Sequence, residues 1–222
     1  MRSLDNDGMT TSNTSVTKTA SRKKSPGVRH EDKRVAILRT AAQLFSTNGY
    51  EATSLDMIAD QLGMHKATLY HYIKSKDEVL YQCLLKSFEN LDQVIEKMHD
   101  RSVPVLERLR HFAISLAHAQ NNDFGRCQVL VGARPLELMA SSGIRAFQRR
   151  LDTTVRELIT EGIAGGEVKP CNTGLLSAML FGTLNWVPQW FKEDGKLSID
   201  EVVECFMNML VNGIGARTQT NR

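Results

Sequence analysis

Residues 35–80 read VAILRTAAQLFSTNGYEATSLDMIADQLGMHKATLYHYIKSKDEVL, and this stretch decides the fold. Its first third predicts an amphipathic helix beginning at about Glu31, because apolar residues recur at intervals of three and four and so share one face. Asn48-Gly49 should end this helix, since both residues tolerate the left-handed backbone conformation. The apolar face consists of Val35, Leu38, Ala41, Ala42 and Phe45.

Capping signals divide the rest of the stretch into further helices. Thr53 and Asp56 have the spacing of a capping box and should start a second helix, which ends at Gly63. A third helix is predicted from about His65 to Ile73. Ser75 and Glu78 form another box, and a long helix is expected from there to about Met98. Its apolar stripe comprises Leu80, Leu84, Phe88, Leu91, Ile95 and Met98.

The second and third helices have the spacing of a helix-turn-helix unit. The second predicted helix is the first helix of this unit. It needs a small residue where the two helices cross, and Ala59 stands there. The turn favours glycine, because its backbone adopts a positive φ, and Gly63 follows four residues later. Leu69, six residues further on, is the apolar residue that packs back onto the first helix. This spacing, together with the capped second helix, the apolar helix before it and the local basic charge, indicates a DNA-binding unit.

Charge is unevenly distributed along the 222 residues. Residues 1–76 contain 12 Lys or Arg and 7 Asp or Glu, a net charge of +5, whereas residues 77–222 carry a net charge of −2. A basic N-terminal third favours a polyanionic partner. Residues 1–30 have almost no large apolar side chains, and we expect a disordered tail. Its basic residues either touch DNA phosphates or are merely solvated: Arg22, Lys23, Lys24 and Arg29.

The remaining chain predicts only helices, so the expected fold class is all-α. Ser102-Pro104 and Pro135 open helices that end at residues 121–123 and 165–166, and no alternating strand pattern occurs. Asn172 and the pair Ser198 and Glu201 should cap the last two helices. The predicted organisation is a tail (1–30), a three-helix DNA-binding domain (31–76) and a helical effector-binding and dimerisation domain (77–222).

Residues 35–80 closely resemble the DNA-binding domain of TetR-family transcriptional regulators. The resemblance rests on AAQLFSTNGYEATS (41–54), Ile58-Ala59, Gly63, Leu69-Tyr70 and Lys74-Ser75-Lys76. It implies a homodimer that binds a near-palindromic site on double-stranded DNA. It further implies that a small effector binds the C-terminal domain and releases the DNA.

The resemblance also implies which residues contact DNA. The third helix would enter the major groove with Lys66 and His71 donating to base edges. Tyr70 and Lys76 match phosphate-binding positions, and the N-terminus of the second helix adds phosphate contacts. An exposed Lys or His on a helix is also typical of a solvated surface. The predicted DNA-binding residues are Thr53, Ser54, His65, Lys66, Ala67, Thr68, Tyr70, His71 and Lys76.

Residues 181–191, FGTLNWVPQWF, resemble the C-terminal domain of one TetR subgroup. In that subgroup the last two helices pair with their copies in a dimer, and we expect Leu180, Leu184, Phe206 and Leu210 to serve this contact. A largely apolar effector, such as an acyl-CoA, is expected between residues 80 and 190. Arginines at 126, 134, 145, 149 and 150 would meet an anionic ligand if they are not simply solvated. The predicted lining residues, any of which is alternatively plain core, are Phe88, His111, Phe112, Phe124, Met139, Phe147 and Trp186.

The competing classes are an enzyme and a DNA-binding protein without sequence preference or ligand control. No GxSxG, HExxH, P-loop or GxGxxG pattern occurs, so we predict no catalytic residues and no cofactor. His111 and His118 share a helix face, but two histidines alone make a weak metal site. Cys83, Cys127, Cys171 and Cys205 are expected as reduced, mostly buried thiols. Without an apolar run or a signal peptide, a cytoplasmic protein without membrane contact is expected.

Overall fold

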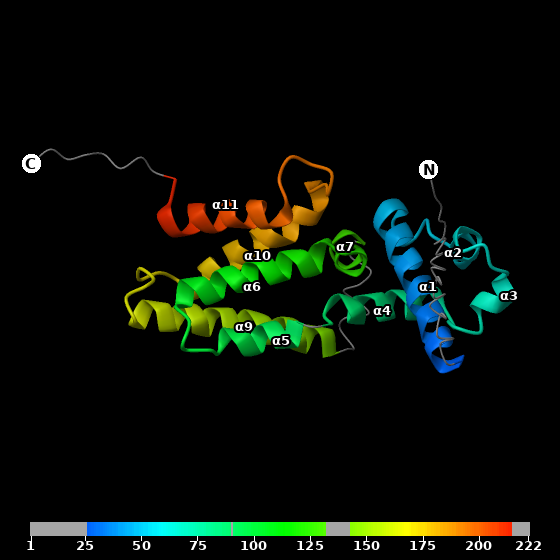
Figure 1. The fold of residues 1–222 in the computed structure, drawn as a ribbon, viewed down its shortest axis with the longest axis horizontal. Coiled ribbons are helices and arrows are strands. Elements are labelled where there is room, and N and C mark those ends of the chain that lie inside the picture. Colours follow the sequence, from blue (N-terminus) through cyan, green and yellow to red (C-terminus); the bar gives the residue numbers. More distant parts are fainter. Residues whose placement is uncertain (1–25, 90, 132–142, 215–222) are drawn as a thin grey trace, which may run out of the picture.

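The computed structural model describes residues 26–89, 91–131 and 143–214, and within these ranges every regular element is a helix. The all-α prediction is therefore confirmed. Two units lie end to end (Figure 1): an N-terminal unit formed by α1 to α4, and a C-terminal bundle formed by α5 to α11. The helices are α1 (Pro26–Asn48), α2 (Leu55–Gln61), α3 (Lys66–Leu69), α4 (Lys76–Ser87), α5 (Leu91–Met98), α6 (Val105–Asn121), α7 (Asp123–Leu130), α9 (Gly143–Ala164), α10 (Thr173–Trp190) and α11 (Ile199–Asn212).

The N-terminal unit is built on the apolar face predicted for α1. Leu38 and Phe45 of α1 are buried against Ile58 of α2, Leu69 of α3 and Leu80 of α4. Helix α1 begins at Pro26, earlier than expected, because proline lacks an N–H and is favoured in a first helical turn. Residues 26–30 are thus helical and not part of a tail, and residues 1–25 lie outside the described residues.

Capping side chains begin several helices. Asn172 accepts a hydrogen bond from the Leu175 N–H, and Ser198 and Glu201 form the reciprocal capping box that was predicted. At α4 the Ser75 hydroxyl accepts from the Glu78 N–H, while the Glu78 carboxylate accepts from the Lys74 N–H and not from Ser75.

The prediction of one long helix from Ser75 to Met98 is wrong. Helix α4 ends at Ser87, and α5 starts at Leu91. The stripe that predicted one helix serves two cores, because Leu80 and Leu84 pack in the N-terminal unit while Leu91, Ile95 and Met98 pack in the bundle. The third helix is also shorter than predicted, since residues 70–72 form a turn.

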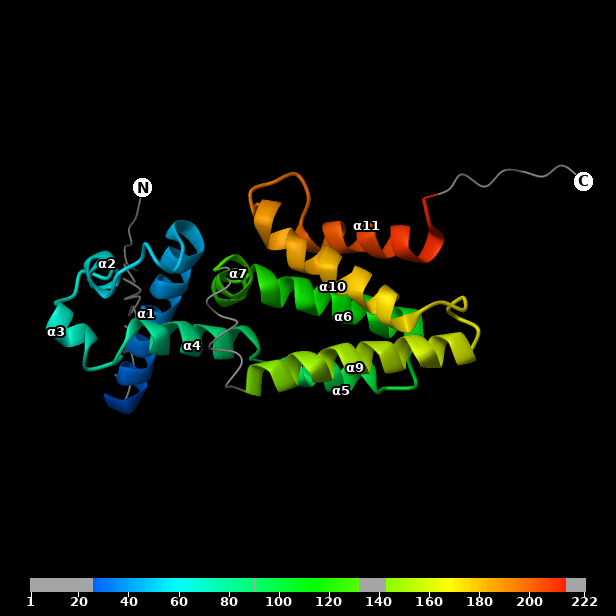
Figure 2. The same ribbon diagram turned by 180° about the vertical axis from the view of Figure 1, so that it is seen from behind.

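Helix α6 is the centre of the C-terminal bundle. It packs against α5, α7, α9, α10 and α11, as the reverse view shows (Figure 2). Phe112 and Leu116 of α6 are buried together with Leu158 of α9 and Leu184 of α10. Within the described ranges, no helix is long and apolar enough to cross a membrane.

Helix α7 connects the two units. It packs against α1 and α4 on one side and against α6 and α10 on the other. Asp123 accepts a hydrogen bond from Gln43 of α1 at 3.0 Å and pairs with Arg39 of α1 at 3.3 Å. Because α4 also packs against both α1 and α7, the domain boundary expected at residues 76–77 stays a prediction.

Candidate nucleic-acid interface and ligand cavity

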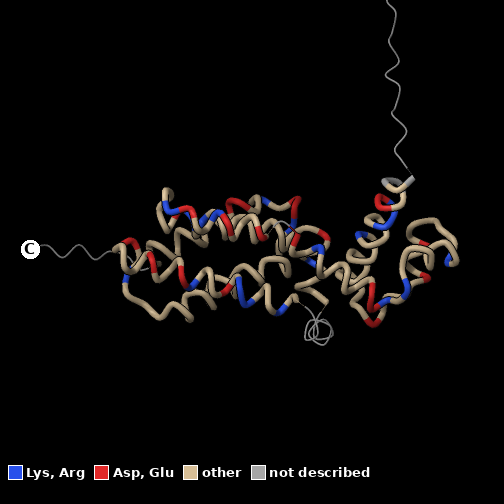
Figure 3. The backbone as a smooth tube through the Cα atoms, turned by 90° about the horizontal axis from the view of Figure 1, so that it is seen from below, with Lys and Arg blue, Asp and Glu red and all other residues tan. Residues whose placement is uncertain are grey.

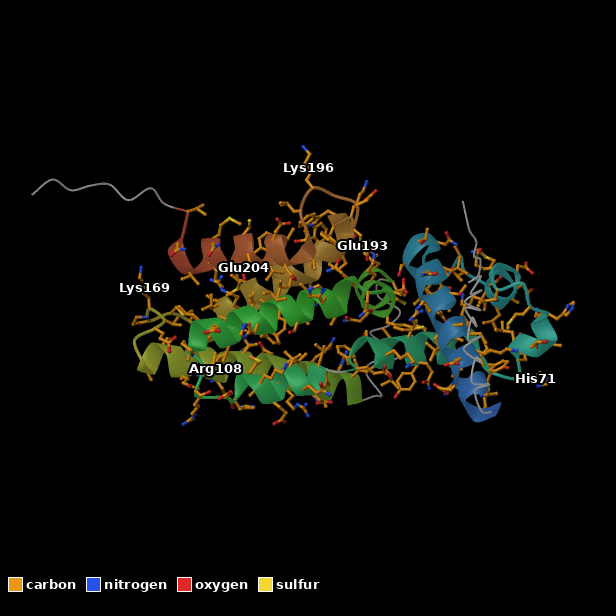
Figure 4. All side chains as sticks on the ribbon, in the orientation of Figure 1. His71, Arg108, Lys169, Glu193, Lys196 and Glu204 are labelled. Atoms are coloured by element: carbon orange, nitrogen blue, oxygen red, sulfur yellow. The ribbon has the colours of Figure 1, made fainter. Side chains whose placement is uncertain are left out.

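The end of the molecule remote from the bundle exposes the short α3 and the turn after it. His65, Lys66, Ala67 and His71 are exposed, Thr68 is half-buried, and Tyr70 is 47% exposed. His71 lies at this outer end of the molecule (Figure 4). Leu69 is fully buried and anchors α3, so the polar residues on both sides of it are turned outward. This is the surface that a helix-turn-helix unit presents to a groove of DNA.

Gly63 makes the turn between α2 and α3. Its φ of 62° is a left-handed conformation, which a residue with a side chain adopts only with strain. The chain then bonds back onto α2, since the Met64 N–H donates to the Ala59 carbonyl at 3.0 Å. The three residues Ala59, Gly63 and Leu69 therefore have the structural roles expected from the sequence.

Lys66 of α3 pairs with Asp56 of α2. The two charged groups lie 2.7 Å apart, and both side chains are more than half exposed. The hydrogen bond to Asp56 and the charge of its carboxylate raise the pKa of Lys66. The lysine predicted to read a base is thus held by a carboxylate at the protein surface.

Ser54, and not Thr53, caps α2. The Ser54 hydroxyl accepts from the Met57 N–H at 3.1 Å and is exposed. Thr53 is 1% exposed, and its hydroxyl lies 2.8 Å from the Gly49 carbonyl oxygen, to which it donates. The predicted capping residue is therefore one position too early. The burial of Thr53 also corrects its predicted role, because a buried hydroxyl cannot touch a phosphate.

Lys76 holds the turn between α1 and α2. Its ammonium donates to the carbonyl oxygens of Tyr50 at 2.9 Å, Thr53 at 3.0 Å and Glu51 at 3.4 Å. The same group lies 4.2 Å from the centre of the Tyr50 ring. These carbonyls occupy the three protons of a lysine ammonium. Any phosphate contact would be shared with this structural role.

We expect Lys76→Ala to lower the stability of the fold. The variant loses charge-assisted hydrogen bonds to three carbonyl groups, and the expected loss is about 2 kcal/mol. Thermal unfolding followed by circular dichroism would measure it. Lys74→Ala, at an exposed position, is the matched control and should unfold at the wild-type temperature. Equal unfolding temperatures for the two variants would contradict the structural role of Lys76.

Basic and acidic positions are interspersed along the C-terminal bundle (Figure 3). Residues 26–76 contain 7 Lys or Arg and 5 Asp or Glu, so most of the predicted N-terminal positive charge precedes residue 26. Arg22, Lys23 and Lys24 lie outside the described residues, as does the side chain of Arg29. The described surface of the N-terminal unit is therefore only modestly basic.

A cavity of about 360 Å³, here called the central cavity, lies between the C-terminal bundle and the end of α4 and opens to solvent beside the exposed Arg156 and Asn185. Apolar walls come from Phe88, Leu91, Leu116, Leu151 and Phe181. Its polar lining contains four amide side chains and one ion pair, which joins Arg156 and Asp152 at 2.8 Å. Ser177 also donates to Asp152, at 2.6 Å. The four amide residues are Gln120, Gln128, Gln148 and Asn185.

The residues predicted to line one ligand pocket are not brought together. Phe88 lines the central cavity, and the Phe147 ring packs against Phe88 at a tilt of 58° with centroids 5.2 Å apart. His111 and Phe112 line a separate hollow of about 350 Å³ between α5 and α6. Phe124 packs against the core of the N-terminal unit, Trp186 is 65% exposed, and Met139 lies outside the described residues.

Gln120 is one of several residues of the central cavity that the sequence pattern did not single out. It is 6% exposed, and its Nε2 donates to the Asn185 Oδ1. No donor among the described residues reaches its Oε1. The sequence does contain a sign that Gln120 is unusual. Phe112, Leu116 and Gln120 recur every four residues and so share the buried face of α6, and Gln120 places an amide on that apolar face.

The arginines predicted to attract an anion are dispersed. Arg126 donates to the Phe191 carbonyl at 3.5 Å, and Arg150 pairs with Asp92. Arg145 and Arg149 are exposed, and Arg134 lies outside the described residues. None of the four described arginines lines the central cavity.

Two cysteines are buried and two are exposed, so the expectation of mostly buried thiols holds only for Cys83 and Cys127. A hydrogen bond to Cys127, together with burial, raises the pKa of Cys83 and keeps it a thiol. Cys171 and Cys205 are exposed. In the described part of the chain, no three His, Cys, Asp or Glu side chains are grouped as metal ligands.

Comparison with known proteins matches both units to one family. The family description "Bacterial regulatory proteins, tetR family" covers residues 37–83, and "Tetracyclin repressor-like, C-terminal domain" covers residues 102–214. The "Fatty acid metabolism regulator protein" of Bacillus subtilis is 26% identical over 195 residues, spanning 82% of this chain and 95% of that protein.

Two solved structures resemble the whole described fold. The TetR-family regulator PfmR of Thermus thermophilus has a TM-score of 0.69 at 28% identity, covering 81% of this chain and 99% of that one. AibR, solved in complex with isovaleryl coenzyme A and operator DNA, has a TM-score of 0.66 at 26% identity, covering 81% of this chain and 98% of AibR.

Proposed function

Since this chain belongs to the TetR family of bacterial regulatory proteins, it is a DNA-binding transcriptional regulator and not an enzyme, and we propose that an effector in its central cavity releases it from an operator that it represses. The effector is a small, largely apolar molecule that contacts Phe88, Leu91 and Phe181. The isovaleryl coenzyme A complex of AibR supports an acyl group as one such ligand. A cytoplasmic location, with access to chromosomal DNA, belongs to the same proposal.

The observation that carries the proposal is the position of α7 and of the end of α4. Ser87 and Phe88 at the end of α4, and Gln128 of α7, line the central cavity. The same two helices pack against α1 of the DNA-binding unit, and Asp123 of α7 is bonded to Arg39 and Gln43 of α1. A ligand that displaces α4 and α7 therefore displaces the helices that carry α3.

For DNA binding we propose that α3 enters the major groove. Lys66 and His71, with Ala67 and Thr68 beside them, face base edges, and Tyr70 and the Ser54 cap face phosphates. Lys66 must exchange Asp56 for a base in this mode, because the two are paired in the free protein. Lys76 contributes chiefly by holding the turn before α2.

The function is tested by selecting duplexes from random DNA with the purified protein. We expect a near-palindromic site with half-sites one or more helical turns apart. Lys66→Ala should relax the preference at one or two base positions by about 1–3 kcal/mol, whereas Lys97→Ala, on the surface of α5, should leave the preference intact. Fluorescence anisotropy on a panel of mutated sites would measure both. Binding without any preferred sequence would contradict the proposal.

We also propose that α10 and α11 form the dimer contact that family members use on DNA. Leu180 and Leu184, expected at this contact, are buried in the chain's own core. Other apolar residues of α10 and α11 form the exposed surface instead. A hollow of about 200 Å³ between the two helices is part of the same surface. A monomer rarely exposes so many large apolar side chains on two adjacent helices. The exposed apolar residues of α10 and α11 are Leu175 (71% exposed), Trp186 (65%), Met179 (51%), Met209 (47%) and Trp190 (47%).

The double variant Met179→Glu/Met209→Glu should therefore be monomeric. Each charge would lie in the proposed apolar contact, where burial of a carboxylate is costly. Operator affinity should fall about 100-fold or more, because each monomer then binds a single half-site without a linked partner on the other. Light scattering after size exclusion would give the mass. Leu85→Glu, at an exposed apolar position on α4, is the control and should stay dimeric. A dimeric double variant would refute the assigned surface.

A further inference from the structure

We propose that Arg22, Lys23 and Lys24 form a second DNA contact, which binds backbone phosphates beside the base pairs that α3 reads. The inference goes beyond the proposed function, because it assigns a binding role to residues outside the helix-turn-helix unit. It depends neither on the effector nor on the central cavity.

The described part of the DNA-binding unit offers little positive charge to a phosphate backbone. Residues 26–76 have a net charge of only +2. Lys66 is paired with Asp56 at 2.7 Å, and Lys76 donates to three backbone carbonyls. Arg39 pairs with an aspartate of α7 at 3.3 Å. Proteins bind duplex DNA in large part through Lys and Arg that neutralise phosphates, so further cations should come from elsewhere in the chain.

The residues before α1 supply such cations. Residues 1–25 contain 5 Lys or Arg and 2 Asp, a net charge of +3. Three of the five basic residues are consecutive, at positions 22–24, and no acidic residue lies between Asp7 and this run. A run of adjacent cations complements adjacent phosphates of a DNA strand.

The start of α1 lies beside the turn that follows α3. The ring of His30, near the start of α1, stacks on Tyr72 with centroids 4.6 Å apart. Tyr72 adjoins His71, which lies at the outer end of the molecule (Figure 4). Pro26 comes four residues before His30, which is about 6 Å along a helix, and Lys24 comes only two residues before Pro26. The basic run therefore joins the folded chain next to the surface that we assign to DNA.

This second contact should add affinity without sequence preference. Ammonium and guanidinium groups that bind phosphates fix the protein on the duplex, whereas groups at base edges select the sequence. The run 22–24 should therefore strengthen binding to every duplex by a similar factor. The preference for one operator should depend on α3 alone.

The test is the salt dependence of DNA binding by the full-length triple variant Arg22→Ala/Lys23→Ala/Lys24→Ala. Fluorescence anisotropy would give affinities for the selected operator and for a non-operator duplex of equal length, over a range of KCl concentrations. The slope of log affinity against log salt should flatten by about five units. Each neutralised phosphate contributes about 0.9 to this slope, and the two protomers of the dimer contribute six cations. Both affinities should fall together, by at least about tenfold at low salt.

The matched control removes the same number of positive charges from the bundle. Lys97→Ala/Lys169→Ala/Lys196→Ala alters three exposed lysines, of which Lys169 and Lys196 lie away from His71 (Figure 4). Its slope should differ from that of the wild type by less than about one unit. If the first triple variant does not melt cooperatively, Arg22→Gln/Lys23→Gln/Lys24→Gln replaces it.

Hydroxyl-radical footprinting at saturating protein locates the contact on the DNA. Backbone positions beside the half-sites should be protected by the wild type and exposed in the triple variant, while protection within the half-sites remains.

The inference is overturned if the variant's slope flattens by no more than about two units beyond the control. It is also overturned if the variant changes the preference among base pairs, or if both proteins give the same footprint. The outcome is separate from that of the proposed function. If Lys66→Ala relaxes sequence preference while residues 22–24 leave the slope unchanged, reading by α3 is supported and this second contact is wrong.

Discussion

Gly125→Ala should unfold the protein at a temperature about 10 °C below that of the wild type and should weaken operator binding. Gly125 lies in α7 where this helix turns back against the end of α6. A Cβ at position 125 would collide with the main-chain carbonyl of Ala119 and would lie 2.6 Å from the Gln120 Cα. Backbone cannot move aside as the end of a side chain can, so the two helices must separate. Overpacking of this kind costs about 3 kcal/mol or more.

Differential scanning calorimetry would measure the change, since about 3 kcal/mol corresponds to roughly 10 °C in a chain of this length. Gly143→Ala is the matched control, because a Cβ at the start of α9 meets no described atom within 4 Å. It should unfold at the wild-type temperature. An unchanged melting temperature for Gly125→Ala would mean that α6 and α7 are not packed as closely as described.

The consequence for DNA binding follows from the neighbours of Gly125. The collision lies beside Gln120, which lines the central cavity, and within α7, which holds α1 through Asp123. If the variant remains folded at 20 °C, we expect operator affinity to be lower because α7 no longer fixes α1. Fluorescence anisotropy with the selected operator would show it.

Arg108→Met should destabilise the protein by about 3 kcal/mol. Arg108 of α6 is 4% exposed and donates to the Met98 carbonyl at 2.8 Å, the Val103 carbonyl at 2.9 Å and the Glu161 carboxylate at 2.5 Å. The arginine thus joins the end of α5 and the loop before α6 to α9. Removing one member of such a pair leaves the other charge and two carbonyl groups without their partner.

Arg110→Met is the matched control on the same helix. Arg110 pairs with Glu204 of α11, but both side chains are about one third exposed, and pairs of that kind contribute no more than about 1 kcal/mol. Chemical denaturation of both variants would give the two free energies of unfolding. Equal losses would show that Arg108 acts only as a surface charge.

The same pair predicts a pH dependence. The hydrogen bonds and charge of Arg108 lower the pKa of Glu161 in the folded state. Folding therefore gains from the ionised Glu161 at every pH above the ordinary pKa of a glutamate, and this gain disappears as the pH falls through the lowered pKa. Glu161→Gln should be less stable than the wild type at pH 7, and the difference should shrink toward pH 3. A difference that does not change with pH would contradict the assignment.

Local rules predicted the N-terminal unit well. The small residue at Ala59, the positive φ at Gly63 and the buried Leu69 are each required within a few residues of one another, so sequence spacing is enough to recognise them. The division between α4 and α5 could not be recognised in this way. Leu84 and Leu91 lie on one continuous stripe, although they belong to different cores.

The lining of the central cavity was predicted less well than the packing of the helix-turn-helix unit. Large aromatic side chains indicated a pocket, but such residues serve equally as core or as exposed contact surface. Phe112 is core, Trp186 is exposed, and among the predicted residues that the structure describes only Phe88 lines the central cavity. The four amides that line it come from four different helices, and no local pattern in the chain shows that they meet.

The ion pair between Lys66 and Asp56 has a consequence for how the regulator searches a chromosome. Non-specific DNA attracts a protein through its unpaired positive charges, and each phosphate contact releases counterions. In the free protein Lys66 lies 2.7 Å from Asp56, so the carboxylate offsets its charge before any DNA contact. In the proposed binding mode, a base edge takes the place of this carboxylate. Lys66 would then add its full charge to the contact only where that exchange occurs.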